Sequence, residues 1–234
     1  MVQKTGIIVQ KKNYTLRTWQ TEDAASLAKY LYNKNIWDNC RDGLPYPYSQ
    51  EDAKVFLAMI QAKENIHDFC IEVNGEAVGS IGFVPATDVE RFSAEAGYWI
   101  GEPFWNQGIV TDALKEAINY YFEHTDKVRV FAVVFEHNSP SMRVLEKVGF
   151  TKVGIMQKAI FKNDNFTNAH YYELIKKSGI HQQSAGQSGR LPINTLPTLN
   201  EIYKNLPLLL KNLKPVHFLL GFLVRTKCLS KFAS

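Results

Sequence analysis

The sequence predicts an α/β or α+β domain in which helices and strands share one mixed sheet. Two apolar runs flank the dipeptide Asn74-Gly75, a combination typical of a tight β-hairpin. The run at 128–135 is rich in Val and Phe, which indicates a buried strand. Apolar residues at helical spacing over 111–122 predict an amphipathic helix between these segments. Because helices and strands are mixed along the chain, we expect them to pack around a single core.

Local signals set the order of the elements. Thr21 is expected to cap the first helix, and Ser49 with Asp52 three residues later predicts a capping box for the second. Residues 34–49 are rich in Asn, Asp, Gly and Pro and are predicted to form a loop. Ser139 is expected to cap a short helix. The predicted strands are 14–19, 68–73, 76–84, 94–100, 128–135, 153–158 and 170–175, and the predicted helices are 22–33, 50–62, 111–122 and 140–147.

The turn between the strand at 94–100 and the helix at 111–122 predicts an anion-binding site. It contains Gly108, where the missing side chain lets the backbone approach a ligand closely. The N–H groups of residues 107–111 would point at one place, and the helix dipole adds positive charge there. This arrangement suits a pyrophosphate; the alternative is an ordinary joint between a strand and a helix. The residues expected to contact the cofactor are Trp99, Ile100, Gln107, Gly108, Ile109, Val110 and Thr111.

Residues 95–111, with the turn Glu-Pro-Phe-Trp-Asn-Gln-Gly, and residues 138–150, ending in Leu-Glu-Lys-Val-Gly-Phe, resemble the two hallmark motifs of the GNAT superfamily of N-acetyltransferases. More narrowly, they look like the branch that acetylates the N-termini of ribosomal proteins, and the resemblance runs from about residue 14 to residue 176. Matches at 16–24 and 41–48 follow in the order of that branch. The resemblance implies a mostly antiparallel sheet that is splayed between two strands and flanked by helices. It also implies acetyl-CoA as co-substrate and direct transfer of acetyl to a primary amine.

The same resemblance assigns roles within the second motif. In the family, the asparagine that matches Asn138 holds the pantetheine arm, and the serine that matches Ser141 lies beside the sulfur. Many members carry a proton-donating tyrosine where this chain has Leu145, so Ser141 is the candidate proton donor. Val110 departs from the small residue of the first motif and is expected to narrow the phosphate loop. The alternative interpretation makes Asn138 and Ser139 simple helix caps.

Glu95 is the candidate general base, because family members often place one on the strand that leads into the phosphate turn. The alternative is a surface carboxylate, or a partner for Arg91 or Arg143. Glu102 and His137 are the next candidates for the base. Both catalytic roles, the base and the proton donor at Ser141, rest on the resemblance and on general acid–base chemistry.

The loop at 41–48 is expected to form the acceptor side of the site. Its Gly, Pro and Tyr content suits a lid, and a packed connector is the alternative. The His and Cys residues lack metal-ligand spacing, so no metal is expected. The substrate-side residues are Arg41, Asp42, Tyr46 and Tyr48.

Charge and composition change near residue 180. Residues 181–234 hold seven of the 27 Lys and Arg but one of the 23 Asp and Glu, so residues 1–180 carry a net charge of −2. This body gives no reason to expect a nucleic-acid partner. Three widely spaced cysteines, with no apolar leader at 1–12, predict a cytoplasmic protein with reduced thiols. The predicted organisation is a catalytic domain at 1–178, a linker at 179–189 and a basic, Leu-rich tail at 190–234 that is no part of the family fold.

The function expected from the resemblance is acetylation of a protein N-terminal amine, as on ribosomal proteins. The alternative acceptor is a small-molecule amine such as an antibiotic or a polyamine, because the fold does not define the acceptor. A second alternative is a protein that binds CoA without catalysis and docks its tail on a membrane or a partner. Membrane contact is the minority interpretation of the tail, and the oligomeric state stays open.

Overall fold

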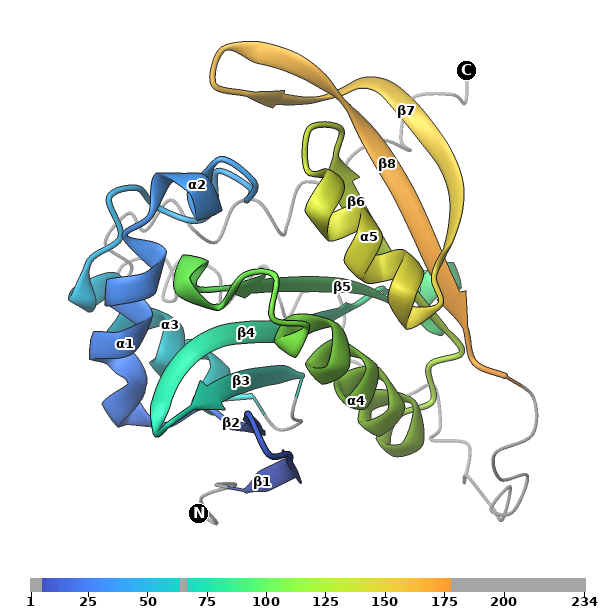
Figure 1. The fold of residues 1–234 in the computed structure, drawn as a ribbon. Coiled ribbons are helices and arrows are strands. Elements are labelled where there is room, and N and C mark those ends of the chain that lie inside the picture. Colours follow the sequence, from blue (N-terminus) through green and yellow to red (C-terminus); the bar gives the residue numbers. More distant parts are fainter. Residues whose placement is uncertain (1–5, 64–66, 178–234) are drawn as a thin grey trace, which may run out of the picture. The chain divides into compact units, whose positions relative to one another are not determined.

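A computed structural model describes residues 6–63 and 67–177, which form an eight-stranded sheet with helices against it (Figure 1). The strand order is β1-β2-β3-β4-β5-β6-β8-β7, and every neighbouring pair is antiparallel except β5–β6. The predicted mixed, mostly antiparallel sheet is confirmed. The strands are β1 (Ile7–Gln10), β2 (Thr15–Thr18), β3 (Asp68–Val73), β4 (Glu76–Pro85), β5 (Ser93–Ile100), β6 (Arg129–Phe135), β7 (Thr151–Lys162) and β8 (Asn165–Ile175), and the α-helices are α1 (Ala24–Leu31), α2 (Lys34–Trp37), α3 (Gln50–Gln61), α4 (Ile109–His124) and α5 (Ser139–Val148).

β5 and β6 separate in the middle of the sheet. Their parallel register joins three residues on each strand, 93–95 with 129–131. β5 stays paired with β4 along its length as far as Ile100, so β5 and β6 diverge beyond Glu95 (Figure 1). The predicted splay is therefore confirmed. It divides the sheet into a first half, β1 to β5, and a second half, β6, β8 and β7.

Alternation along the strands gives the sheet two packed faces. Phe69 and Ile71 of β3 lie in the main core with residues of α4 and α5. Cys70, between them, points to a second core that is shared with residues of α1 and α3. In the second half, Val134 of β6 belongs to the main core, whereas Val133 faces the opposite side. Helices α4 and α5 therefore pack on one face, and α1 and α3 pack on the other.

The predicted hairpin and the predicted capping box at Ser49 are confirmed. Asn74 and Gly75 adopt φ values of 52° and 79°, as a two-residue turn with positive φ requires. Ser49 Oγ accepts from Asp52 N at 3.1 Å, and the Asp52 carboxylate accepts from Ser49 N at 2.8 Å. Both signals could be recognised in the sequence because each depends on contacts within four residues.

Two predicted caps are wrong, by one residue at α5 and by two at α1, whose N-cap position is Asp23. α5 is capped by Asn138 and not by Ser139, because Asn138 Oδ1 accepts from Ser141 N at 3.2 Å. Thr21 lies inside a short 3₁₀ turn whose N-cap is Gln20. The position of a cap depends on the backbone angles at which a helix begins, and composition does not set these angles.

Two elements were not predicted, and two strands are longer than predicted. β1 pairs with β2 at the sheet edge and was not predicted. α2 lies within the predicted loop because Asn33 Oδ1 accepts from two backbone N–H groups at 2.8 and 3.3 Å and so caps it. β7 and β8 extend up to a turn at Asn163 and Asp164, with φ of 51° and 57°. The longer strands lack clear alternation because most of β7 is exposed.

The predicted linker at 179–189 and tail at 190–234 lie outside the described residues, so these predictions and the domain boundary stay untested. Among the helices of residues 6–63 and 67–177, none is long and apolar enough to cross a membrane.

Candidate active site

The predicted anion site lies at the N-terminus of α4. Gly108 is its N-cap and adopts φ 77° and ψ −6°, a conformation that disfavours a side chain. A Cβ built on Gly108 would meet no heavy atom within 4 Å, so the space beside this backbone is open. The first N–H groups of a helix have no acceptor within the helix and are available to an anion. The turn can therefore hold a phosphate group by backbone hydrogen bonds.

Two hydrogen bonds from side chains to the backbone fix the turn. Trp105 Nε1 donates to Ile100 O at 2.8 Å, and Gln107 Nε2 donates to Pro103 O at 2.8 Å. Ile100 and Ile109 are buried in the main core, and Val110 packs partly against it. These predicted cofactor residues can therefore contact a ligand mainly through their backbone. Val110 is accommodated on the core side of the turn.

Asn138 and Ser141 lie together at the start of α5. Asn138 Oδ1 accepts the hydrogen bond from Ser141 N. The Nδ2 group of Asn138 can therefore donate to a carbonyl of the pantetheine arm. Leu145, which stands in place of the family tyrosine, is fully buried in the main core. It contributes packing, so Ser141 remains the polar candidate on this helix.

Tyr98 of β5 contacts the candidate site at Ser141, and the sequence analysis missed it. Its Oη lies 2.8 Å from Ser141 Oγ and 3.1 Å from Ser141 O. Burial raises the pKa of Tyr98, and the hydrogen bond with Ser141 opposes that rise only in part. At neutral pH the phenol therefore carries its proton and can donate it to one of the two serine oxygens. The available signal was strand alternation, which places Tyr98 on the opposite face of β5 from Glu95.

Glu95 and Arg41 form an ion pair, with Arg41 Nη2 donating to Glu95 Oε1. The Arg41 side chain is 71% exposed and the Glu95 side chain 25%. The predicted base and one predicted substrate-side residue are thus brought together. The sequence analysis offered Arg91 and Arg143 as possible partners of Glu95. The observed partner is Arg41, which is 54 positions away.

A pocket of about 310 Å³ lies beside Arg41 and Asp42, against the second half of the sheet. Its floor comes from residues of β6 and β8 that face away from the main core, including Phe135 and Tyr171. Lys162 of β7 closes one side. Burial raises the pKa of the lining thiol Cys40 to about 11, so it stays protonated at neutral pH. This pocket is the candidate acceptor site.

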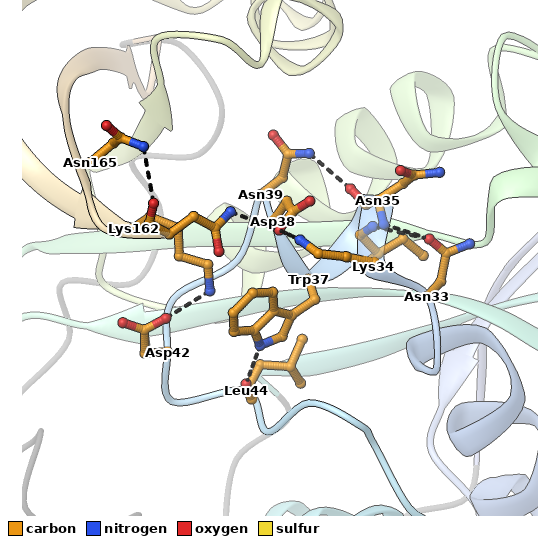
Figure 2. A network of polar contacts seen from close by, with 12 residues as sticks. Asn33, Lys34, Asn35, Trp37, Asp38, Asn39, Asp42, Leu44, Lys162 and Asn165 are labelled. Atoms are coloured by element: carbon orange, nitrogen blue, oxygen red, sulfur yellow. Dashed lines mark hydrogen bonds and ion pairs between the residues drawn. The ribbon is translucent and has the colours of Figure 1, made fainter.

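Figure 2 shows how the loop beside this pocket is held. Lys162 Nζ lies 2.7 Å from Asp42 Oδ1 and 3.3 Å from the centroid of the Trp37 ring. Sequence reasoning missed Lys162 because the pair joins residues 120 positions apart. The other predicted substrate-side residues do not line the pocket. Tyr48 is 5% exposed in the second core, and Tyr46 packs on Trp37.

The two reserve candidates for the base lie elsewhere. Hydrogen bonds from Asn33 and Asn35 lower the pKa of Glu102, which is an exposed carboxylate in the turn after β5. His137 is exposed next to Asn138. Within the described part of the chain, no group of three or more His, Cys, Asp and Glu could hold a metal ion.

The described site thus combines a helix N-terminus that can bind an anion with a half-buried hydroxyl pair on one face of β5 and a carboxylate on the other. Residues 13–151 match the family described as acetyltransferase (GNAT) domain, and the chain belongs to this family. The predicted family and the predicted activity class, N-acetyltransferase, are therefore confirmed.

Relatives differ in the acceptor that their names record. The ribosomal-protein-serine acetyltransferase of Escherichia coli is 28% identical over 131 residues, which cover 54% of this chain and 72% of that protein. The spermidine N(1)-acetyltransferase of the same species is 28% identical over 155 residues, covering 64% and 74%. The solved structure of RimL, a ribosomal L7/L12 alpha-N-protein acetyltransferase in complex with coenzyme A, has a TM-score of 0.65 and 23% identity and covers 73% of this chain and 98% of that chain.

Proposed function

We propose that this chain transfers the acetyl group of acetyl-CoA to the N-terminal amine of a peptide or protein. One observation carries the proposal: two kinds of polar group flank the splay from opposite faces of β5. Tyr98 and Ser141 lie on the α5 face, and Glu95 with Arg41 lies on the pocket face. Donor and acceptor can thus approach from the two faces and meet in a ternary complex without an acyl-enzyme.

The residues at α4 and α5 fit the donor. The N–H groups of residues 107–111 would hold the pyrophosphate, and Asn138 Nδ2 would donate to the pantetheine arm. When bound, acetyl-CoA supplies an activated thioester. Similarity to a CoA-bound relative supports this assignment.

Glu95 and Ser141 are the proposed proton-transfer groups. A peptide amine has a pKa of about 8, so at neutral pH it is mostly protonated and cannot attack. Glu95 accepts that proton, directly or through a water, before the neutral nitrogen forms the new C–N bond, and a second N–H proton leaves to water as the amide forms. Ser141 gives its hydroxyl proton to the sulfur when the C–S bond breaks, Tyr98 returns a proton to Ser141 Oγ, and Tyr98 regains its proton from water before the next turnover.

The charges around the pocket favour a peptide amine over a polyamine. Arg41 and Lys162 are cationic, and the lining carboxylate of Asp42 is already paired with Lys162. Glu95 is likewise paired with Arg41. A polyamine carries several positive charges and needs several available carboxylates, whereas a peptide N-terminus carries one charge and presents carbonyl groups that Arg41 can bind.

Release of CoA in the presence of four compounds, three amines and one blocked peptide, tests the proposal. The acceptors are a peptide with a free N-terminal serine, the same peptide N-acetylated, spermidine and an aminoglycoside. We expect release with the free peptide alone. Preferential release with spermidine would reject the peptide N-terminus as the acceptor but would still support acetyl transfer to an amine. No release with any amine, at saturating acetyl-CoA that binds by calorimetry, would favour a protein that binds CoA without catalysis.

A further inference from the structure

Two adjacent loop residues bind opposite halves of the sheet. Arg41 pairs with Glu95 on β5 in the first half. Asp42 Oδ1 lies 2.7 Å from Lys162 Nζ at the end of β7 in the second half. Between these halves, the β5–β6 register joins residues 93–95 with 129–131. The dipeptide therefore spans the splay on the pocket face.

Lys162 is held more tightly than its place on an edge strand requires. It is the buried residue at the end of a strand that is otherwise mostly exposed, and its side chain is 4% exposed. A buried ammonium costs free energy unless it is paired, and here the Asp42 carboxylate and the face of Trp37 provide that pairing. A lysine on an exposed strand can usually extend its ammonium into water. Its burial indicates that the contact with the loop is specific.

Neighbouring contacts reinforce this junction (Figure 2). Asn163 Nδ2 donates to Asp38 Oδ1 at 2.9 Å, and Lys34 Nζ lies 2.6 Å from the same oxygen. Although burial opposes the shift, these two hydrogen bonds lower the pKa of Asp38 and keep it charged at neutral pH. Trp37 Nε1 donates to Leu44 O at 2.9 Å. The tip of the β7–β8 hairpin thus contacts α2 and is hydrogen-bonded to the loop that follows it.

We propose that Lys162 is a positioning residue for the acceptor: through Asp42 it holds residues 40–42 against the hairpin, and so keeps Arg41 at Glu95 on the pocket wall. The inference rests on the proposed function, in which this pocket takes the acceptor amine. Arg41, Asp42 and Lys162 all line the pocket, whereas the anion site at Gly108 lies at α4. Loss of the Lys162 charge should therefore weaken acceptor binding and leave donor binding intact.

The test compares Lys162→Met with the parent in the full-length protein, because methionine keeps the apolar stem and removes the ammonium. We expect the KM for the free N-terminal serine peptide to rise by roughly tenfold, the size expected for the loss of one charge-assisted hydrogen bond. The Kd for acetyl-CoA should stay within about twofold. Amide hydrogen exchange of residues 38–44 should become faster. Asp42→Asn, at an exposed position that tolerates substitution, should reproduce these changes.

Lys162→Arg should keep the parental KM, because a guanidinium can bind the Asp42 carboxylate and stack on Trp37. Lys29→Met is the matched control: it also removes a lysine from an ion pair, with Glu76 at 2.6 Å, but away from the pocket. Parental exchange at 38–44 and parental KM in Lys162→Met would overturn the proposal, as would an equal rise in KM in Lys29→Met. If no amine releases CoA, the proposed function fails and hydrogen exchange alone decides whether Lys162 holds the loop.

Discussion

Tyr98 Oη lies 2.8 Å from Ser141 Oγ, and this contact joins β5 to α5 across the start of the splay. The hydroxyl pair is half-buried, and the tyrosine can also donate to Ser141 O at 3.1 Å. The orientation of the Ser141 proton therefore depends on a residue from another element. This dependence gives the first prediction.

Tyr98→Phe should lower kcat by about tenfold, because Ser141 loses the partner that orients and replenishes its proton. The affinity for acetyl-CoA should hold. Tyr172→Phe is a suitable control, since Tyr172 Oη also binds α5, at Glu146 Oε1 3.1 Å away, yet lies outside the proposed proton path. Steady-state kinetics across pH 6–9 check both variants, and a parental profile for Tyr98→Phe would show that Ser141 acts alone.

Glu95→Gln should lower kcat by about 10²–10⁴-fold while acetyl-CoA affinity is retained. The amide can still accept from Arg41, so the loop should keep its place. Without a base, the rate should follow the fraction of neutral amine and rise about tenfold per pH unit below pH ~8. Ser141→Ala should cost less, because a thiolate is already a tolerable leaving group. Glu102→Gln serves as the control, and equal losses in Glu95→Gln and Glu102→Gln would reject Glu95 as the base.

Gly108→Glu should abolish acetyl-CoA binding, because it places a carboxylate at the proposed pyrophosphate site. Gly75→Glu separates this effect from backbone strain: Gly75 has φ 79°, close to the 77° of Gly108, and also has open space beside it. Both variants should lose similar stability, but Gly75→Glu should bind the cofactor normally. Calorimetry on the folded proteins measures the difference. Unchanged affinity in Gly108→Glu would show that acetyl-CoA does not bind at this turn.

Asp23→Ala should destabilise the fold by about 3–5 kcal/mol, because it leaves a buried guanidinium without its main partner. Arg17 Nη1 and Nη2 each lie 2.8 Å from the Asp23 carboxylate, and both residues are buried. Glu72 Oε2 lies 2.5 Å from Arg17 Nε and still pairs with the guanidinium. The loss of stability should therefore fall toward the lower end of that range. Thermal unfolding should show a Tm lower by roughly 6–20 °C. The double variant Arg17→Met/Asp23→Leu should recover most of the stability lost in Asp23→Ala. If it does not, the ion pair itself stabilises the fold.

The sequence by itself determined the elements whose signals are local. The Asn74-Gly75 turn, the capping box of Ser49 and the glycine turn at Gly108 each depend on a few consecutive residues. The resemblance carried by two short motifs was enough to indicate the family and the splayed sheet. The exact caps and the ends of β7 and β8 were missed because tertiary contacts move such boundaries by a few residues.

Only the tertiary structure decided which side chains meet. Tyr98 and Ser141 are 43 residues apart, Arg41 and Glu95 are 54 apart, and Lys162 and Asp42 are 120 apart. Such pairs depend on strand register, on which face of β5 a side chain occupies and on how far β5 and β6 diverge. A one-residue shift of register would reverse every face, and no local pattern records the register between distant strands. The sequence therefore determined the family and the motifs, whereas the structure decided the partners of Glu95 and Ser141 and the wall of the candidate acceptor pocket.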